Sequence, residues 1–581
     1  MLIPQVILLR PQPWSPRAPQ RREIPLPLPL SRLVLLAFGA SLVLSGCRTE
    51  SSTFGPAQRA RDGNVFYLGG GSEPESIDPG KAYDSPGLGV TRNIFEGLMR
   101  YDPRTLDPLP GVAASYEKSE DGTHYLFLLR REARWSDGSP VTAHDFEWSW
   151  KRVLRPETAA QYAALLWDLK NGRAFAEGRV PEEAVGVKAL DDHTLEVTLE
   201  RPIPWFLEVL SFGPFTPVHR GAVEAHGTNW TRPENIVTNG PFHLSRWVIS
   251  YQIELVKSET YWGKDEVSLD KAVFVISDDA HAMMRLFRAG ELDWIGSDVA
   301  PPQEYLSFLK TKDDFHTSQS LATYYLIFNL REETPAQRAS PLLDKRVRKA
   351  LDMAVDKDAI VQFVTRGGQR AARSIVPDYF LERGYRPPPG NAYDPQGARD
   401  LLAAAGYGPG GKPFPVIEFT YNTNESHRQV AEAIQQMWRK ELGIHVQLVN
   451  QEWKVFMSNR NEGYFQLSRA GWTGDFQDPY SFLALFLGDA DMNASRWKNE
   501  EYDRLVDQAL AEQDQQKRYE LYARAEAILL DELPIIPIYF YSSNTLLGSW
   551  VGGYHPTPQN IHPLRDIRLL PQDRPVARET P

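Results

Sequence analysis

The segment from Trp135 to Phe146 reads Trp-Ser-Asp-Gly-Ser-Pro-Val-Thr-Ala-His-Asp-Phe and contains two local structure signals. Its Asp137-Gly138 pair is typical of a tight turn. Thr142 stands three places before Asp145, which is the spacing of a capping box at a helix start. The helix would carry its large apolar residues on one face, namely Phe146, Trp150 and Val153. The segment therefore predicts a turn followed by an amphipathic helix.

Outward from this segment, strand patterns alternate with helical ones. The residues from Thr194 to Leu199 alternate between apolar and polar as a half-buried strand does, and Phe66–Gly69 leads into a glycine-rich turn. Helical periodicity is expected at 344–364, 426–442 and 502–530. Further strands are expected at 253–256, 272–276, 417–421, 446–449 and 535–541. This order predicts α/β lobes with largely parallel sheets.

Length, composition and charge limit the class of protein. A chain of 581 residues is too long for one ordinary core, so two or three lobes are expected. Hydrophobic residues make up 42% and charged residues 24%, which is typical of a globular protein. The net charge of -11 argues against nucleic-acid binding, because no basic surplus is available to replace phosphate counterions.

The N-terminal region has the features of an export signal. Basic residues precede an apolar run from Leu33 to Leu44, which is too short to span a bilayer. The run ends in Leu44-Ser45-Gly46-Cys47, which resembles the lipobox of bacterial lipoproteins. We therefore expect a signal peptide over 1–46, a lipidated Cys47, a flexible tether over 47–62 and an extracytoplasmic, membrane-anchored protein. The alternative is a secretory signal with an incidental cysteine.

The single cysteine also limits the chemistry. If Cys47 is lipidated, the mature chain has no thiol for catalysis, metal binding or a disulfide. The sequence contains no G-x-S-x-G, H-E-x-x-H or phosphate-binding G-x-x-x-x-G-K-[ST] motif, and its 12 histidines lack metal-ligand spacing. We therefore expect a protein that is not an enzyme and that holds no metal or cofactor. An exported hydrolase that uses carboxylates stays open.

The segment from Arg469 to Phe476 carries a guanidinium and a carboxylate on either side of Trp472. Asp475 lies six positions after Arg469. A carboxylate held beside an indole suits a ligand ammonium, and a nearby arginine suits a ligand carboxylate. A ligand that carries both charges at a backbone-length separation is a peptide. The alternative is a surface ion pair beside a core tryptophan.

Several motifs together resemble a known family. They are Trp135–Trp150, Asn239-Gly240-Pro241-Phe242, Tyr261-Trp262, Asn450-Gln451-Glu452-Trp453 and Ala470–Leu483. In this order they resemble the solute-binding components of ABC importers, in the dipeptide/oligopeptide/nickel family and its oligopeptide-binding branch. The resemblance runs from about Val65 to about Arg568.

The resemblance implies an α/β fold in which two lobes close on a ligand as a clamp, similar to the type II periplasmic binding proteins, with an additional third domain. It places lobe I in three pieces, at 63–95, 221–321 and 543–570. It places the extra domain at 96–220 and lobe II at 322–542. The last residues, 571–581, are charged and contain proline, and we expect a disordered tail.

The resemblance also implies roles for charged residues. Asp475 matches the family carboxylate that pairs with the ligand's α-ammonium. Arg469, Arg460 and His427 match three cations that receive the ligand's α-carboxylate, each at a different ligand length. A dipeptide, nickel or sugar binder would not need the whole set. Their alternative role is that of ordinary surface or helix-start polar residues.

Aromatic residues match family positions along the ligand channel, namely Tyr162, Tyr325, Trp453, Trp472 and Tyr541. The family binds the peptide backbone as an added strand, and each of these rings could equally be core packing. The chain also departs from the family. Enteric members bridge two cysteines at the positions of Ala322 and Thr473, and acidic residues near the cleft are replaced by Tyr83 and Ile327.

The expected function is capture of short oligopeptides in the cleft between the lobes and delivery to an ABC permease. The expected partners are the peptide, the permease and the membrane that holds the lipid, with the protein itself a monomer. A dipeptide or murein-peptide binder of the same family is the first alternative, and the exported hydrolase is the second.

Overall fold

The computed structural model describes residues 52–571, apart from 57, 60–62, 297–298, 409 and 491. The predicted signal peptide, the lipidation site Cys47 and the predicted tail beyond residue 571 lie outside the described residues. All described residues belong to one unit, 51–581.

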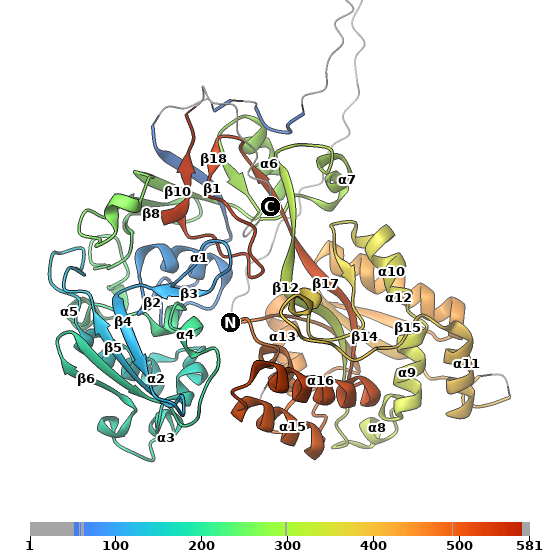
Figure 1. Ribbon diagram of the computed structural model, residues 1–581. Helices are drawn as coiled ribbons and strands as arrows, with labels where there is room; N and C mark the ends of the chain where they lie inside the picture. Colours follow the sequence, from blue (N-terminus) through green and yellow to red (C-terminus); the bar gives the residue numbers. More distant parts are fainter. Residues whose placement is uncertain are drawn as a thin grey trace, which may run out of the picture. The chain divides into compact units, whose positions relative to one another are not determined.

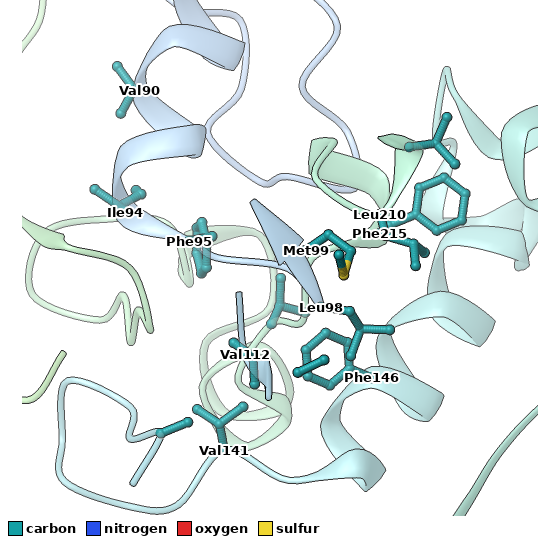
Figure 2. Close-up of a cluster of buried hydrophobic side chains, with 14 of the residues drawn as sticks. Val90, Ile94, Phe95, Leu98, Met99, Val112, Val141, Phe146, Leu210 and Phe215 are labelled. Carbon is teal, nitrogen blue, oxygen red and sulfur yellow. The ribbon is translucent and has the colours of Figure 1, made fainter. Parts of the chain in front are cut away.

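The capping box at Thr142 starts helix α2 (Ala143–Leu154) as the sequence predicts. The Thr142 backbone N–H donates to the Asp145 carboxylate at 2.8 Å, and the Thr142 hydroxyl donates to it at 2.9 Å. The predicted apolar face of α2 is buried, and the Trp150 indole N–H donates to the Phe215 carbonyl at 2.8 Å. Figure 2 shows part of this core, where Leu98 and Val112 lie close to Phe146.

Helix α2 packs on a small antiparallel sheet. Its strands run in the order β4 (Ala113–Lys118), β5 (His124–Leu129), β7 (Thr194–Thr198) and β6 (Val187–Asp191). The buried side chains of this sheet and of α2 belong to the same hydrophobic core as β1 (Val65–Gly71) and helix α1 (Ser85–Ile94). The region expected as an extra domain therefore shares its core with the region expected as lobe I.

A second, much larger sheet has eleven strands. Ten of them follow one path, in the order β15 (Val446–Gln451), β14 (Ile417–Asn422), β16 (Leu467–Thr473), β12 (Phe315–Phe328), β17 (Ile535–Leu547), β11 (Trp294–Ile295), β1, β10 (Lys271–Ile276), β9 (Gln252–Lys257) and β8 (Phe242–Val248). The remaining strand, β13 (Arg370–Ala371), pairs with β17. The long strands β12 and β17 run side by side at the centre of this order (Figure 1).

This sheet is mixed, so the expectation of largely parallel sheets is wrong. Parallel pairing is confined to β1 with its neighbours β10 and β11, and to β14 with β15 and β16. The other pairs are antiparallel, including β12 with both β16 and β17. Apolar periodicity identifies a strand but carries no information on the direction of its neighbour.

Helices pack on the part of the sheet from β15 to β17 in two groups with separate cores. One core contains residues of α9 (Lys345–Met353), α11 (Pro395–Ala404) and α12 (Glu425–Leu442). The other contains residues of α15 (Glu500–Ala511) and α16 (Gln515–Glu532).

Two expected long helices are interrupted by capping aspartates. Asp514 accepts from the Lys517 N–H at 3.0 Å and starts α16 as a new helix, so the expected helix at 502–530 is two helices. Asp356 similarly accepts from the Ala359 N–H at 2.9 Å and starts α10 (Lys357–Ala359), which leads into a π-helical turn, η9 (Ile360–Thr365). The side chain of a capping aspartate accepts hydrogen bonds from the first N–H groups of the following helix. These N–H groups then need no carbonyl of the preceding helix, so the preceding helix can end.

The described part of the expected tether is attached to the folded body. The backbone N–H groups of Phe54 and Gly55 donate to the Asp314 carboxylate at 2.8 and 2.7 Å. The Arg59 guanidinium is buried and pairs with Asp293 at 3.2 Å. The expectation of a flexible tether over 47–62 is thus wrong for these described residues, because distant carboxylates hold their polar groups.

Candidate functional site

Three of the predicted binding residues, Arg469, Trp472 and Asp475, lie on strand β16 or directly after it. Register in the sheet places Arg469 opposite Leu326 and Trp472 opposite Thr323, both on β12. The strand ends at Thr473, and the chain continues into Gly474 and Asp475. The Gln559 side-chain amide donates to the carbonyls of Gly474 and Asp475, at 3.0 and 2.9 Å. The register of β16 and these two hydrogen bonds thus fix the backbone position of Asp475.

The Asp475 carboxylate has no hydrogen-bond or ion-pair partner among the described residues. Its backbone N–H donates to the Ser481 hydroxyl at 3.0 Å, which orients the residue. Its side chain is partly buried, and burial raises the pKa of this carboxyl to about 7. A buried carboxylate without a partner is unfavourable, so the site is suited to a ligand cation that supplies the missing charge and donors.

Arg469 and His427 are in direct contact. The Arg469 guanidinium donates to His427 Nε2 and lies over the Tyr324 ring, 5.6 Å from its centroid. Burial, together with the Arg469 charge, lowers the pKa of His427 to about 3. The imidazole is therefore neutral at pH 7, which corrects the expectation of three cations. Its position in the first turn of α12, near the positive end of the helix, also disfavours the charged form.

Arg460 is the second arginine of the site. It lies on α13 (Trp453–Glu462), 5.7 Å from the centroid of the Phe456 ring. Its Nε and the Nε of Arg469 are both buried without a hydrogen-bond partner among the described residues. Burial lowers the pKa of the Arg460 guanidinium, and the charge of Arg469 lowers it further. The chain thus holds two neighbouring guanidinium groups without a carboxylate, an arrangement suited to an anion.

A cavity of about 420 Å³ lies beside Arg469. Trp472 and Tyr541 contribute aromatic surface to its wall. The rest of the lining is mainly small or polar and uncharged, with residues such as Ser320, Ser543, Gln559 and Asn560. Sequence reasoning did not identify these four, because isolated polar residues at strand ends and in loops carry no distinctive pattern.

The other predicted aromatic residues lie in different environments. Tyr325 is buried on β12 and packs edge-on against Phe486, with centroids 6.0 Å apart. Tyr162 is partly buried, and burial raises its pKa, as does the charge of Asp475. Trp453 is 50% exposed and stacks on Phe456. Trp453 and Arg460 are therefore not part of the cavity wall beside Arg469.

The three departures from the family pattern have structural counterparts. Ala322 and Thr473 lie directly opposite each other in the β12–β16 ladder. Ile327 is buried in β12. Tyr83 donates its hydroxyl to the Glu75 carboxylate at 2.5 Å. An acidic side chain, that of Glu75, therefore lies beside position 83.

The chain that follows Asp475 packs against residues of the expected extra domain. Trp205 stacks on Phe476 with centroids 4.4 Å apart. The Gln477 backbone N–H donates to both oxygens of Glu208, at 2.9 and 3.1 Å. Burial raises the pKa of Glu208 to about 8. We call this the 205–208 contact, and it joins segments that are more than 260 residues apart in the chain.

No helix in the described part of the chain is long and apolar enough to cross a membrane. Within the same residues, no group of three or more His, Cys, Asp or Glu side chains could hold a metal ion.

Comparisons with known proteins identify the family of the chain. A family model described as bacterial extracellular solute-binding proteins, family 5, matches residues 107–494. The chain is 37% identical to the periplasmic oligopeptide-binding protein OppA of Escherichia coli K12 over 494 residues, which is 83% of this chain and 88% of the relative. It is 36% identical to the periplasmic murein peptide-binding protein MppA of the same organism over 495 residues, with the same coverage.

Solved structures share the fold. The murein tripeptide-binding protein MppA of Escherichia coli superposes with a TM-score of 0.77 at 33% identity, covering 88% of this chain and 99% of that one. The complex of Haemophilus influenzae OppA with the peptide RPPGFSPFR superposes with a TM-score of 0.75 at 31% identity, covering 88% of this chain and all of that one.

Proposed function

Because the chain belongs to the bacterial extracellular solute-binding proteins of family 5, we propose that it captures short oligopeptides outside the cytoplasm and delivers them to an ABC permease. The protein performs no chemistry on the peptide. Closure of two lobes on the ligand would signal the loaded state, and ATP hydrolysis would belong to the permease complex. The lobes are those expected from the sequence, at 63–95 with 221–321 and 543–570, and at 322–542, with the extra domain at 96–220.

One observation carries this proposal, namely that Asp475 after β16, Arg469 on β16 and Arg460 on α13 have no oppositely charged partner among the described residues. Asp475 would bind the α-ammonium of the peptide, because its partly buried carboxylate lacks a protein partner. Arg469 and Arg460 would bind the α-carboxylate, because their buried Nε atoms lack acceptors. A zwitterion aligned with the strand supplies both missing partners at once.

The peptide backbone would lie extended beside β16. Main-chain hydrogen bonds give affinity without dependence on the ligand's side chains. Trp472 and Tyr541 would provide flat surface for those side chains in the 420 Å³ cavity, with Tyr162, Tyr325 and Trp453 along the rest of the channel. The neutral His427 would donate from Nδ1, which has no acceptor among the described residues.

The lipid anchor belongs to the same proposal. Acylation of Cys47 would hold the protein at the outer face of a membrane after removal of residues 1–46. Wild-type protein should then partition into detergent, and Cys47→Ala protein should lose the acyl-dependent part of this partitioning. A radiolabelled fatty acid incorporated into wild type but not into Cys47→Ala is the measurement that checks it.

Two alternatives differ in ligand class. A dipeptide or murein-peptide binder has a specific observation in its favour, since the relatives include a murein peptide-binding protein at 36% identity. An exported hydrolase has none, and the matching family is one of solute-binding proteins.

Calorimetry with matched peptides tests the proposal. Trialanine should bind, and N-acetyl-trialanine and trialanine amide should each bind much more weakly, because each lacks one of the two charges. A murein tripeptide in the same series tests the first alternative, because a murein-peptide binder should bind it more tightly than trialanine. Equal binding of the free and acetylated peptides would exclude the assigned role of Asp475.

A further inference from the structure

The first described residues of the chain are fixed beside a short helix. The Ser52 carbonyl accepts from the Asp313 N–H at 2.8 Å. Phe54 and Gly55 bind the buried Asp314 carboxylate, as described above. This attachment point lies just before β12 and just after helix α7 (Leu306–Leu309). The place where the N-terminal segment leaves the body is therefore defined.

Exposed aromatic rings and basic side chains surround this point. Phe308 on α7 is 46% exposed, and its ring packs edge-on against Phe54 with centroids 6.4 Å apart. The Lys312 ammonium lies over the Phe308 ring, 4.7 Å from its centroid. The Arg288 guanidinium lies over Phe54 in the same way, at 5.8 Å. Tyr305, in the turn before α7, is 39% exposed.

The same surface continues onto η9. The Lys310 ammonium donates to the Arg366 carbonyl at 2.7 Å, and the Gln303 amide donates to the carbonyls of Val364 and Thr365. A hollow of about 490 Å³ lies between the two segments. Beside it, Phe363 is 60% exposed, which is more than core packing would allow. We call this surface the anchor-side face, made of Tyr305, Phe308, Lys310, Lys312, Phe363 and Arg366.

Chain length brings this face close to the lipid. Cys47 and Ser52 are five positions apart. An extended chain covers at most about 3.6 Å per residue, so Ser52 stays within about 18 Å of an acylated Cys47. Aromatic rings with an apolar body favour the membrane–water interface, and lysine and arginine favour anionic head groups. Two exposed acids lie nearby, namely Glu304, which pairs with His281 at 2.9 Å, and Asp313, which adjoins Lys312 in the chain.

We propose that the anchor-side face rests on the surface of an anionic lipid bilayer, with Phe308 and Phe363 at the head-group level and Lys310, Lys312 and Arg366 against lipid phosphates. This contact would orient the receptor on its membrane. It rests on the lipid anchor at Cys47 proposed above. A protein partner such as the permease is the competing occupant of the face.

Fluorescence quenching from within the bilayer tests the contact. The full-length lipoprotein is reconstituted into vesicles of phosphatidylcholine and phosphatidylglycerol that carry a nitroxide-labelled lipid. Because acylation would consume the only native thiol, Phe308→Cys can be labelled at one position. Leu190→Cys is the matched control, since Leu190 on β6 is 49% exposed and lies outside the anchor-side face. The label at 308 should be quenched strongly and the label at 190 weakly.

Charge variants identify the cause of the quenching. Lys310→Gln with Lys312→Gln should lower quenching at position 308, since each basic residue removed from an anionic surface weakens attraction roughly fivefold. Lys310→Arg with Lys312→Arg should retain it. Flotation of all variants with the vesicles checks the anchor itself.

The outcomes separate the two proposals. Failure of the wild type to float would exclude the lipid anchor and, with it, the membrane contact. Flotation with equal quenching at 308 and 190, in vesicles of lipid alone, would overturn the membrane contact and leave the lipid anchor standing.

Discussion

The Asp475 carboxyl group links stability to binding at the scale of one residue. Burial raises its pKa to about 7 from an ordinary value near 3.8, so the folded chain binds this proton more tightly than the unfolded chain does. The free energy of unfolding therefore falls as pH rises from about 4 to about 7. The residue that would bind the peptide ammonium is thus a cost to the peptide-free protein at neutral pH.

Replacing Asp475 by Asn should stabilise the peptide-free protein at pH 8 and leave its stability almost unchanged at pH 4. The gain should be about 1–2 kcal/mol, below the roughly 4 kcal/mol of the full pKa shift, because the side chain keeps some contact with solvent. Urea denaturation at both pH values measures it. Asp121→Asn, at an exposed turn where hydrogen bonds lower the carboxyl pKa, is the control and should show no gain at pH 8. A destabilised Asp475→Asn at pH 8 would contradict the assigned cause.

Binding should depend on the same proton. Below pH 7 a peptide ammonium must displace the proton from Asp475, so affinity should fall up to about tenfold per pH unit and binding should release a proton. Calorimetry in buffers of different ionisation enthalpy measures this release. In Asp475→Asn the residual affinity should show no such dependence between pH 5 and pH 7.

The two arginines should distinguish ligands by length. An extended peptide advances about 3.3 Å per residue, so each added residue moves its carboxylate from one cation toward the next. Arg469→Ala should weaken short alanine peptides most and Arg460→Ala longer ones, each by about 1–3 kcal/mol. Calorimetry with peptides of two to five residues decides this. Arg428→Ala, which removes exposed ion pairs on α12, should affect no length. Equal losses of affinity at every peptide length would mean that the two arginines form a generic basic cleft and do not distinguish length.

At the scale of elements, strands β12 and β16 hold the site in register. Their ladder sets Trp472 opposite Thr323, and the Thr323 hydroxyl donates to the Ile375 carbonyl at 2.8 Å. One further residue along, Ala322 faces Thr473 two positions before Asp475. A covalent link between positions 322 and 473 would therefore restrain the segment that carries Asp475.

A disulfide should therefore form in the variant Ala322→Cys with Thr473→Cys, made on a Cys47→Ala background. Opposed residues of adjacent antiparallel strands have the Cα separation that disulfides require. Closing this long loop should raise the free energy of unfolding by about 2–4 kcal/mol. Denaturation with and without reductant measures the gain. The single variant Ala322→Cys should show no effect of reductant. A gain of zero in the oxidised double variant would mean that the ladder is strained or open at this end.

At the scale of the whole molecule, the 205–208 contact joins the segment after Asp475 to the expected extra domain. It combines the stacking of Trp205 on Phe476 with the hydrogen bonds of Glu208. Because Asp475 directly precedes this contact, its packing should hold the carboxylate in place for the ligand.

Trp205→Ala should weaken peptide binding without removing any charge. Loss of a buried tryptophan costs about 3–5 kcal/mol of stability. The specific expectation is faster amide hydrogen exchange at residues 474–480, together with weaker peptide affinity. Trp230→Ala is the control, since Trp230 is also buried but packs on Phe95. It should cost stability and leave exchange at 474–480 unchanged. Similar exchange at 474–480 in both variants would mean that the 205–208 contact does not hold the Asp475 segment in place.

Local sequence determined those features whose signals span a few residues. The Thr142 capping box and the strand patterns rest on neighbours three or four positions away, or on the alternation along one strand, and the structure contains them where they were expected. The family likewise follows from long ordered motifs. Tertiary structure alone decided the mixed direction of the large sheet. It also decided that His427 is neutral, since burial and a guanidinium 42 positions away lower its pKa. It placed Ser52–Gly55 against Asp313 and Asp314, and Gln477 against Glu208.

Strand direction, protonation state and long-range pairing have one physical cause in common. Each depends on which distant groups are brought together and on how much water is excluded between them, and no window of sequence contains that information.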